Sequence, residues 1–269
     1  MRLRSLLFAP GNKAEVLAKL PRSGPDGVVL DLEDAVPSDA KDEARQVVAA
    51  AAPALVTEHP ELSVFVRVNA VPSEWFAADI AALPEGIAGI VVPKLESADQ
   101  VAALPPLPVI AGLETAAGVA RAEAVLADGQ VVAAYFGAED YVADMGGVRT
   151  LESTEVLYAR SAVALAARLT GTLALDQVVT DLRDEERFRA DAAVGRSLGY
   201  RGKLCIHPAQ VAWAHEAFSP SEQELDRARR LLAAYEEAKA AGTAAIAFEG
   251  QMVDEPLARQ AQALLDSAD

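Results

Sequence analysis

Short apolar runs alternate with helix-like stretches along most of this 269-residue chain, and this alternation constrains its fold more than any other feature. Such runs predict buried strands, because parallel sheets are covered by helices on both faces. Eight of them are found, at residues 3–8, 28–32, 64–68, 87–92, 108–113, 131–136, 173–176 and 203–206. Eight strands alternating with helices over about 240 residues predict an α/β fold, a (β/α)8 TIM barrel.

A doubly wound open sheet is the alternative architecture for such an alternation. That fold usually contains fewer strands and often has a glycine-rich first turn that binds a nucleotide. The sequence contains neither a GxGxxG pattern nor a P-loop. The barrel is therefore the favoured prediction.

The last part of the chain lies beyond the eighth repeat. Residues 221–240 carry apolar side chains at helical spacing, and a mixed apolar segment at 244–256 precedes a final Ala/Leu-rich stretch. We therefore expect a barrel domain over residues 1–240 and a helical extension over 241–269. An apolar extension must bury its surface, either on its own barrel or on a neighbouring subunit.

Charge and composition exclude several kinds of partner. The chain carries 24 Lys and Arg against 40 Asp and Glu, a formal net charge of -16. Nucleic acids and anionic membranes attract basic surfaces, so neither is expected as a partner. No apolar run reaches the roughly 18 residues that span a bilayer.

Cysteine content and the beginning of the sequence bear on the compartment. Cys205 is the one cysteine, which excludes an internal disulfide and a cysteine-rich zinc site. The basic and apolar residues 1–10 are not followed by a small-residue cleavage site, so we expect no signal peptide. The expected location is the cytoplasm.

Two acids stand where neighbouring apolar runs end. Glu114 follows the fifth run, and Asp140 follows the sixth. In α/β barrels, ligands bind at the carboxyl ends of the strands. Two carboxylates at that edge favour a hard cation, although acids that merely begin the next helices are the simpler interpretation of each one alone. Gly112 shares the face of Glu114, which predicts space beneath the acid.

Arg67 adds a positive charge to the same edge, near the end of the third run. An arginine in an apolar strand is costly unless it meets a carboxylate or a ligand, so it either contacts a ligand or neutralises Glu114 or Asp140. Together the three residues suit an α-oxo or α-hydroxy acid. The cation would then take two substrate oxygens, two carboxylates and waters in the octahedral shell of Mg²⁺.

Further acids crowd the end of the second run. Glu33 and Asp34, beside Asp31, are candidates for orienting metal-bound waters. The simpler interpretation is helix capping together with ion pairs to Lys41 or Arg45.

The motifs taken together resemble the citrate lyase β-subunit-like proteins of the HpcH/HpaI aldolase superfamily, whose relatives include malyl-CoA and citramalyl-CoA lyases. The resemblance covers almost the whole chain in order. It rests on the segments SLLFAPG (5–11), LDLEDAV (30–36), RVN (67–69), PK (93–94), ET (114–115), FGAED (136–140), CIHP (205–208) and FEGQMVD (248–254).

This resemblance implies a Mg²⁺-dependent lyase that makes or breaks a carbon–carbon bond between an acyl-CoA enolate and an α-oxo acid. Glu114 and Asp140 fall at the family's metal-ligand positions, and Arg67 at the arginine that contacts the substrate. Asp254 matches an acid/base that reaches a neighbouring subunit's site in a trimer or hexamer. Lys94 and Lys13 are candidates for contacting CoA.

Other functions remain open at this point. The chain could be a true citrate lyase β subunit that acts on an acyl-carrier-protein thioester. It could also be a CoA-independent aldolase that joins pyruvate to an aldehyde. A non-catalytic module that binds oxo acids is a further alternative, although it leaves the segment around Asp254 unused.

Overall fold

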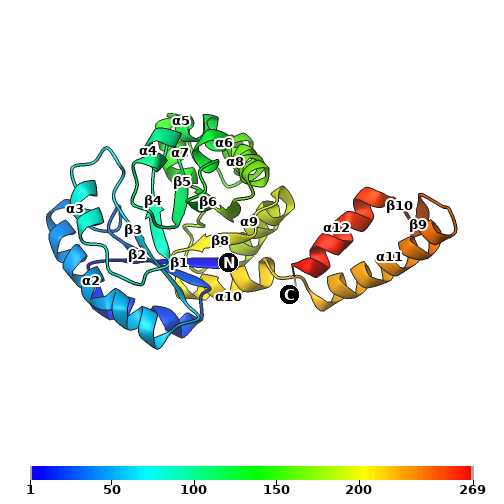
Figure 1. Cartoon of the computed structure of the whole chain (residues 1–269), viewed down its shortest axis with the longest axis horizontal. Helices are drawn as coiled ribbons and strands as arrows, with labels where there is room; N and C mark the ends of the chain where they lie inside the picture. Colours follow the sequence, from blue (N-terminus) through cyan, green and yellow to red (C-terminus); the bar gives the residue numbers. More distant parts are fainter. Residues whose placement is uncertain (1, 268–269) are drawn as a thin grey trace. The chain divides into compact units, whose positions relative to one another are not determined.

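Eight parallel strands close into a barrel in the computed structural model, which describes residues 2–267 (Figure 1). Each strand pairs with the next along the chain, and β8 pairs with β1. The predicted (β/α)8 fold is therefore confirmed. The strands are β1 (Ser5–Pro10), β2 (Gly27–Asp31), β3 (Ser63–Arg67), β4 (Gly89–Val92), β5 (Val109–Leu113), β6 (Val131–Phe136), β7 (Leu173–Asp176) and β8 (Gly202–Cys205).

Helices and short 3-10 turns follow the strands and surround the barrel (Figure 1). None of the helices described in residues 2–267 is long and apolar enough to cross a membrane. The barrel helices are α1 (Ala14–Leu17), α2 (Lys41–Glu58), α3 (Phe76–Ala81), α4 (Ala98–Ala102), α5 (Ala116–Ala120), α6 (Ala122–Leu126), α7 (Ala138–Asp144), α8 (Leu157–Thr170), α9 (Glu185–Leu198) and α10 (Pro208–Ala217).

Side chains from alternate strand positions fill the barrel interior, because successive residues of a strand point to opposite faces. Most of these side chains are apolar, and they form one buried cluster. It contains Leu6, Val29, Phe65, Val91, Ile110, Ala133, Tyr135, Leu175 and Leu204. The next inward position above this cluster on several strands carries the polar residues described below.

The helix starts agree with the sequence only in part. Ser97 caps α4 by accepting a hydrogen bond from the Gln100 backbone N–H. Asn12 and Ser38 are residue types that often cap helices, but neither does so here: α1 begins after Lys13 without a side-chain cap, and a 3-10 turn at 38–40 precedes α2.

A second compact unit begins at Glu216, and the first ends at His215. The second unit contains α11 (Glu222–Ala240), the antiparallel pair β9 (Ile246–Phe248) and β10 (Gln251–Val253), and α12 (Glu255–Asp266). Its apolar cluster joins α11, β10 and α12 through Ala228, Leu231, Tyr235, Val253, Ala258 and Ala261. The expected division at residue 240 lies inside this unit, directly after α11.

Candidate active site

A cavity of about 430 Å³ lies at the carboxyl ends of the barrel strands. One part of its lining is charged and the other is apolar. The charged side chains are Asp31, Asp34, Arg67, Glu114, Glu139 and Asp140, and the apolar ones include Phe8, Val178, Leu204 and Ile206. Such a cavity suits a small molecule that has anionic groups at one end and an apolar part at the other.

Glu114 is a buried acid of this cavity, with a relative exposure of 2%. It follows β5 directly, and its Oε1 accepts a hydrogen bond of 3.0 Å from the Lys94 backbone N–H. Gly137 leaves room for it, since a Cβ there would lie 2.4 Å from Glu114 Oε2. Burial, followed by the negative charge of Glu33, raises the pKa of Glu114 to about 7.

Asp140 approaches the same place from the first turn of α7, with its side chain 39% exposed. The Lys94 ammonium lies 3.7 Å from Glu114 Oε1 and 3.5 Å from Asp140 Oδ1. Both carboxylates thus face one position that already carries a positive charge. This donor set fits a hard divalent cation such as Mg²⁺, which prefers carboxylate oxygens.

Water or substrate would have to complete the shell of such a cation. Within residues 2–267, no three His, Cys, Asp or Glu side chains are grouped so that they could hold a metal. A site of two carboxylates with the remaining positions open is common where Mg²⁺ binds together with a substrate.

Lys94 is the centre of the acid cluster. Its ammonium lies 2.6 Å from Glu33 Oε1 and 3.7 Å from Asp34 Oδ2, in addition to its contacts with Glu114 and Asp140. Although burial lowers its pKa, the negative charges of Glu114 and Glu33 raise it well above its ordinary value. The sequence suggested Lys94 as a CoA contact, whereas these ion pairs direct it toward the acids.

Arg67 lies at the end of β3, opposite its register partner Asp31 on β2. Its Nε and Nη2 donate to the two carboxylate oxygens of Asp31, each at 2.7 Å, and its Nη1 lies 2.8 Å from Glu33 Oε2. The alternative in which Arg67 forms an ion pair with Glu114 or Asp140 is therefore wrong, because Arg67 pairs with Asp31 and Glu33. These acids hold the guanidinium in one orientation at the cavity wall.

A buried polar network holds the segment that follows β2 in place. The Lys41 ammonium donates to the carbonyls of Leu32 and Glu33 and to the Asn69 side chain. Asn69 in turn donates to Asp79. Lys41 thus binds two backbone carbonyls and the Asn69 side chain, not the carboxylates at the end of β2, so the predicted ion pairs of those acids with Lys41 are wrong. Arg45 pairs instead with Asp79 and Asp42.

Tyr135 is a cavity residue that the sequence reasoning missed. It points inward from β6, opposite Gly112 on β5, and its relative exposure is 2%. A Cβ at Gly112 would lie 2.4 Å from the Tyr135 hydroxyl oxygen, so this side chain fills the space expected beneath Glu114. Strand parity could have found it, because Ala133 and Tyr135 share the inward face of β6.

Four predicted residues are not part of this cavity lining: Glu33 and Lys94, which pair with each other, and Lys13 and Asp254. Lys13 is exposed at the start of the four-residue helix α1. Asp254 belongs to the second unit, where it follows β10 at the N-cap position of α12. Its side chain makes no capping hydrogen bond to that helix. The carboxylate of Asp254 is therefore not engaged in capping.

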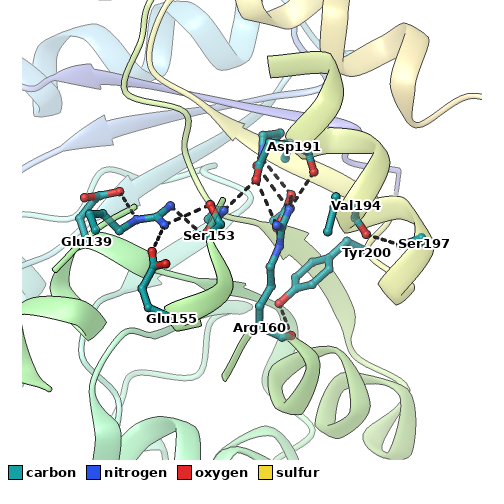
Figure 2. A network of polar contacts seen from close by, with 12 residues as sticks. Glu139, Ser153, Glu155, Arg160, Asp191, Val194, Ser197 and Tyr200 are labelled. Atoms are coloured by element: carbon teal, nitrogen blue, oxygen red, sulfur yellow. Dashed lines mark hydrogen bonds and ion pairs between the residues drawn. The ribbon is translucent and has the colours of Figure 1, made fainter. Parts of the chain in front are cut away.

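A charged network packs beside the cavity, around the outward faces of β7 and β8 (Figure 2). Arg160 donates to Asp176 and Asp191, Lys203 pairs with the same two acids, and Tyr200 donates to the Arg160 carbonyl. The two cations balance the two carboxylates, so this buried network holds α8 and α9 against the barrel. Nearby, Glu139 and Glu155 share one arginine, Arg149 (Figure 2).

A family model and several known proteins match this chain over most of its length. Residues 4–208 match the family model described as HpcH/HpaI aldolase/citrate lyase. A citrate lyase subunit beta-like protein of Deinococcus radiodurans is 58% identical, covering 98% of this chain and 96% of that protein. A citrate lyase subunit beta of Leuconostoc mesenteroides subsp. cremoris is 35% identical, with coverage of 98% and 93%. A (3S)-malyl-CoA thioesterase of Cereibacter sphaeroides is also 35% identical, with coverage of 93% and 89%.

Solved structures of the protein CitE from Mycobacterium tuberculosis are similar over nearly the whole chain. One, in complex with magnesium, acetoacetate and coenzyme A, has a TM-score of 0.88 and 36% identity, covering 98% of this chain and 97% of that chain. Another, in complex with magnesium and pyruvate, has a TM-score of 0.79 and 32% identity, with coverage of 98% and 100%.

Proposed function

The chain belongs to the HpcH/HpaI aldolase/citrate lyase family, and we propose that it is a Mg²⁺-dependent carbon–carbon lyase acting on a short β-hydroxyacyl-CoA. Cleavage of a malyl-, citramalyl- or citryl-type thioester would give an acetyl-type acyl-CoA and an α-oxo acid, and synthesis would reverse this. One observation carries the proposal: Glu114 and Asp140 face one cationic position in a cavity that Arg67 also lines.

Glu114 and Asp140 would hold the Mg²⁺ ion, with its remaining ligands coming from substrate oxygens and water. When bound, the ion supplies a Lewis acid and a template for the oxo acid. The magnesium complexes of CitE, with pyruvate in one and with acetoacetate and coenzyme A in the other, support this assignment. Glu33 and Asp34 would accept hydrogen bonds from waters at the same site.

Arg67 would bind the carboxylate and the oxo oxygen of the α-oxo acid. A guanidinium has five N–H donors. Asp31 takes two of them and Glu33 faces a third, so two remain for a ligand in the cavity. Because Asp31 and Glu33 fix the orientation of Arg67, its charge is pre-organised for the carboxylate of the oxo acid and for the alkoxide that forms when the β-hydroxyl loses its proton.

The bond changes define what else the protein must do. In cleavage, the β-hydroxyl loses its proton, the bond between the α and β carbons breaks, and its electron pair passes into the enolate of the acyl-CoA. The enolate carbon then takes up a proton, which gives the acyl-CoA product. A positioned carboxyl group can make that transfer.

Asp254 is the residue proposed for this proton transfer, from a neighbouring subunit of a homotrimer or homohexamer. Its carboxylate is partly exposed and does not cap its own helix, which leaves it available. The segment of residues 241–269 would pack on that neighbouring subunit. Lys13, exposed at the start of α1, remains a candidate for contacting CoA.

A substrate panel tests the proposal. Acetyl-CoA and propionyl-CoA would be incubated with glyoxylate, pyruvate or oxaloacetate, with and without Mg²⁺, and the thioesters would be identified by mass spectrometry. A new β-hydroxyacyl-CoA that depends on Mg²⁺ supports the lyase. Release of free CoA without a new thioester would instead indicate hydrolysis, as in the name of the (3S)-malyl-CoA thioesterase relative.

A second candidate function is that of a citrate lyase β subunit acting on an acyl-carrier-protein thioester. The similarity to a citrate lyase subunit beta over 98% of this chain favours it. Turnover of CoA thioesters by the isolated chain would oppose this candidate, whereas turnover of the carrier-protein thioester alone would support it.

Two further readings predict different outcomes of the same panel. A CoA-independent aldolase would join pyruvate to a free aldehyde and leave every thioester unchanged. A non-catalytic module would bind pyruvate or oxaloacetate in the presence of Mg²⁺ without turnover of any substrate.

A further inference from the structure

Lys94 carries the positive charge that lies between the two carboxylates proposed to hold Mg²⁺. Its ammonium is 3.5 Å from Asp140 Oδ1 and 3.7 Å from Glu114 Oε1. It is also hydrogen-bonded to Glu33 Oε1 at 2.6 Å. One lysine is therefore the common cationic partner of Glu33, Glu114 and Asp140.

The backbone is built to place this lysine there. Lys94 has a φ of 54°, in the left-handed region that a residue with a side chain rarely adopts. In this conformation the Lys94 backbone N–H donates to Glu114 Oε1 at 3.0 Å while its side chain reaches Glu33. Such a strained conformation persists only where the surrounding contacts determine it, which is typical of functional positions.

The acids need a positive charge nearby. The side chains of Glu33 and Glu114 are 7% and 2% exposed, and two buried carboxylates that lie close together disfavour each other's ionised form. Lys94 offsets this repulsion. A second cation that approaches Glu114 and Asp140 must therefore overcome the repulsion of the ammonium, since like charges a few ångströms apart interact strongly in a partly buried site.

We infer that Lys94 is a built-in counter-cation of the metal site, which competes with Mg²⁺ for Glu114 and Asp140 and sets the affinity of the protein for the ion. Mg²⁺ binding weakens the contacts of the ammonium with Glu114 and Asp140, while its hydrogen bond to Glu33 keeps the lysine in place. Lys94 is thus a positioning residue of the acid cluster. This inference rests on the proposed function, because it takes Glu114 and Asp140 as the metal ligands.

Calorimetric titration with MgCl₂ alone, on protein freed of divalent ions, tests the inference without any turnover. Lys94→Met keeps the length of the side chain and removes its charge. We expect it to bind Mg²⁺ about tenfold more tightly than the wild type, because a repelling charge is lost. We also expect a lower melting temperature without Mg²⁺ and a larger rise when Mg²⁺ is added.

Three other variants complete the design. Lys94→Gln repeats the loss of charge with a polar side chain, and Lys94→Arg, which keeps the charge, should bind Mg²⁺ with nearly wild-type affinity. Lys19→Met removes a lysine charge from an exposed position and should change neither quantity.

Two results would overturn the inference in different ways. If Lys94→Met and Lys94→Gln bind Mg²⁺ as the wild type does, or more weakly, Lys94 is not a competitor of the ion. In that case wild-type binding that disappears in Glu114→Gln would leave the proposed metal site intact. If the wild type itself binds no Mg²⁺, the metal site of the proposed function fails together with the inference.

Discussion

Glu114 is one of the two carboxylates proposed to hold the metal ion, and its surroundings are well defined. It is buried, it accepts the Lys94 backbone N–H, and it packs against Gly137. Its position is thus fixed by contacts that do not require a metal, so its charge can be removed without rebuilding the site.

The first prediction concerns the removal of the Glu114 charge. Glu114→Gln should lower Mg²⁺ affinity by about a hundredfold or more, because a neutral amide replaces one of two carboxylate ligands. The melting temperature should stay close to that of the wild type, since the amide oxygen can still accept the Lys94 N–H. Calorimetry and thermal unfolding measure the two quantities. Glu123→Gln, an exposed substitution on α6, is the control, and equal Mg²⁺ affinity in both variants would contradict the assignment.

A second prediction concerns pH. The pKa of Glu114 in the folded protein is about 7, above its ordinary value of 4.5, so between these values the folded chain holds a proton that the unfolded chain has lost. This group therefore lowers the stability of protein without Mg²⁺ as the pH rises from 4.5 to 7. Mg²⁺ needs the carboxylate, so its affinity should rise with pH and be about tenfold weaker one unit below the pKa. Calorimetric titrations with Mg²⁺ at pH values below and above the pKa of Glu114 measure this. An Mg²⁺ affinity that does not change across this pH range would contradict the assignment of Glu114 as a ligand.

The positions of the strand ends predicted only part of this site. Glu114, Asp140 and Arg67 could be predicted because each stands at the end of an apolar run. The pairing of Arg67 with Asp31 depends on the register between β2 and β3, which one sequence does not reveal. The position of Lys94 depends on a positive φ that no local pattern signals at a lysine.

At the scale of elements, the close packing between the ends of β5 and β6 determines whether the Glu114 carboxylate fits at its position. Gly137 follows β6, and a Cβ there would lie 2.4 Å from Glu114 Oε2. A side chain at this position must therefore displace the carboxylate or shift the strand end. The glycine is required by packing, not by a left-handed backbone, because its φ is -98°.

Gly137→Ala should weaken Mg²⁺ binding by about tenfold and lower the melting temperature, because overpacking at a tight contact moves its neighbours. Gly129→Ala adds the same methyl group where nothing lies within 4 Å, so it serves as the matched control. Calorimetry on both variants makes the comparison. Wild-type Mg²⁺ affinity in Gly137→Ala would show that the carboxylate does not depend on this contact.

The strands were predicted more accurately than the elements between and after them. Long apolar runs identify strands because the barrel covers both of their faces. The segment at 244–256 was recognised only as apolar, whereas it forms the β9–β10 hairpin. Its turn places Glu249 and Gly250 at φ values of 48° and 80°, and ion pairs to Arg227 and Arg230 hold Glu249 there. Glycine at the second turn position was the only local signal.

At the scale of the whole molecule, the chain forms a barrel unit and a second unit built on α11 and α12. The alternation of eight runs predicted the barrel directly. The predicted boundary at residue 240 came from counting repeats, and this count assigned α11 to the barrel. The apolar contacts of α11 with β10 and α12 place it in the second unit, and such long-range contacts are not visible in sequence periodicity.

The proposed role of Asp254 leads to a prediction about the assembly. Asp254→Ala should keep Mg²⁺ and oxo-acid binding but lose turnover, because it removes only the proton transfer. If Asp254 acts in a neighbouring subunit, mixed assemblies of Asp254→Ala and Glu114→Gln chains should regain activity in about a quarter of their sites. Rates of the separate and co-assembled variants measure this. Near-full activity of Asp254→Ala alone, or no recovery on mixing, would contradict the shared site.

In the proposed reaction, this chain breaks a carbon–carbon bond with the help of a cation held by Glu114 and Asp140. The most direct measurement is the release of α-oxo acid and acyl-CoA from malyl-CoA and citramalyl-CoA, followed by mass spectrometry. We expect equal amounts of both products with Mg²⁺, and neither after chelation of the metal or in Glu114→Gln. Cleavage that continues without the metal, or at the wild-type rate in Glu114→Gln, would contradict it.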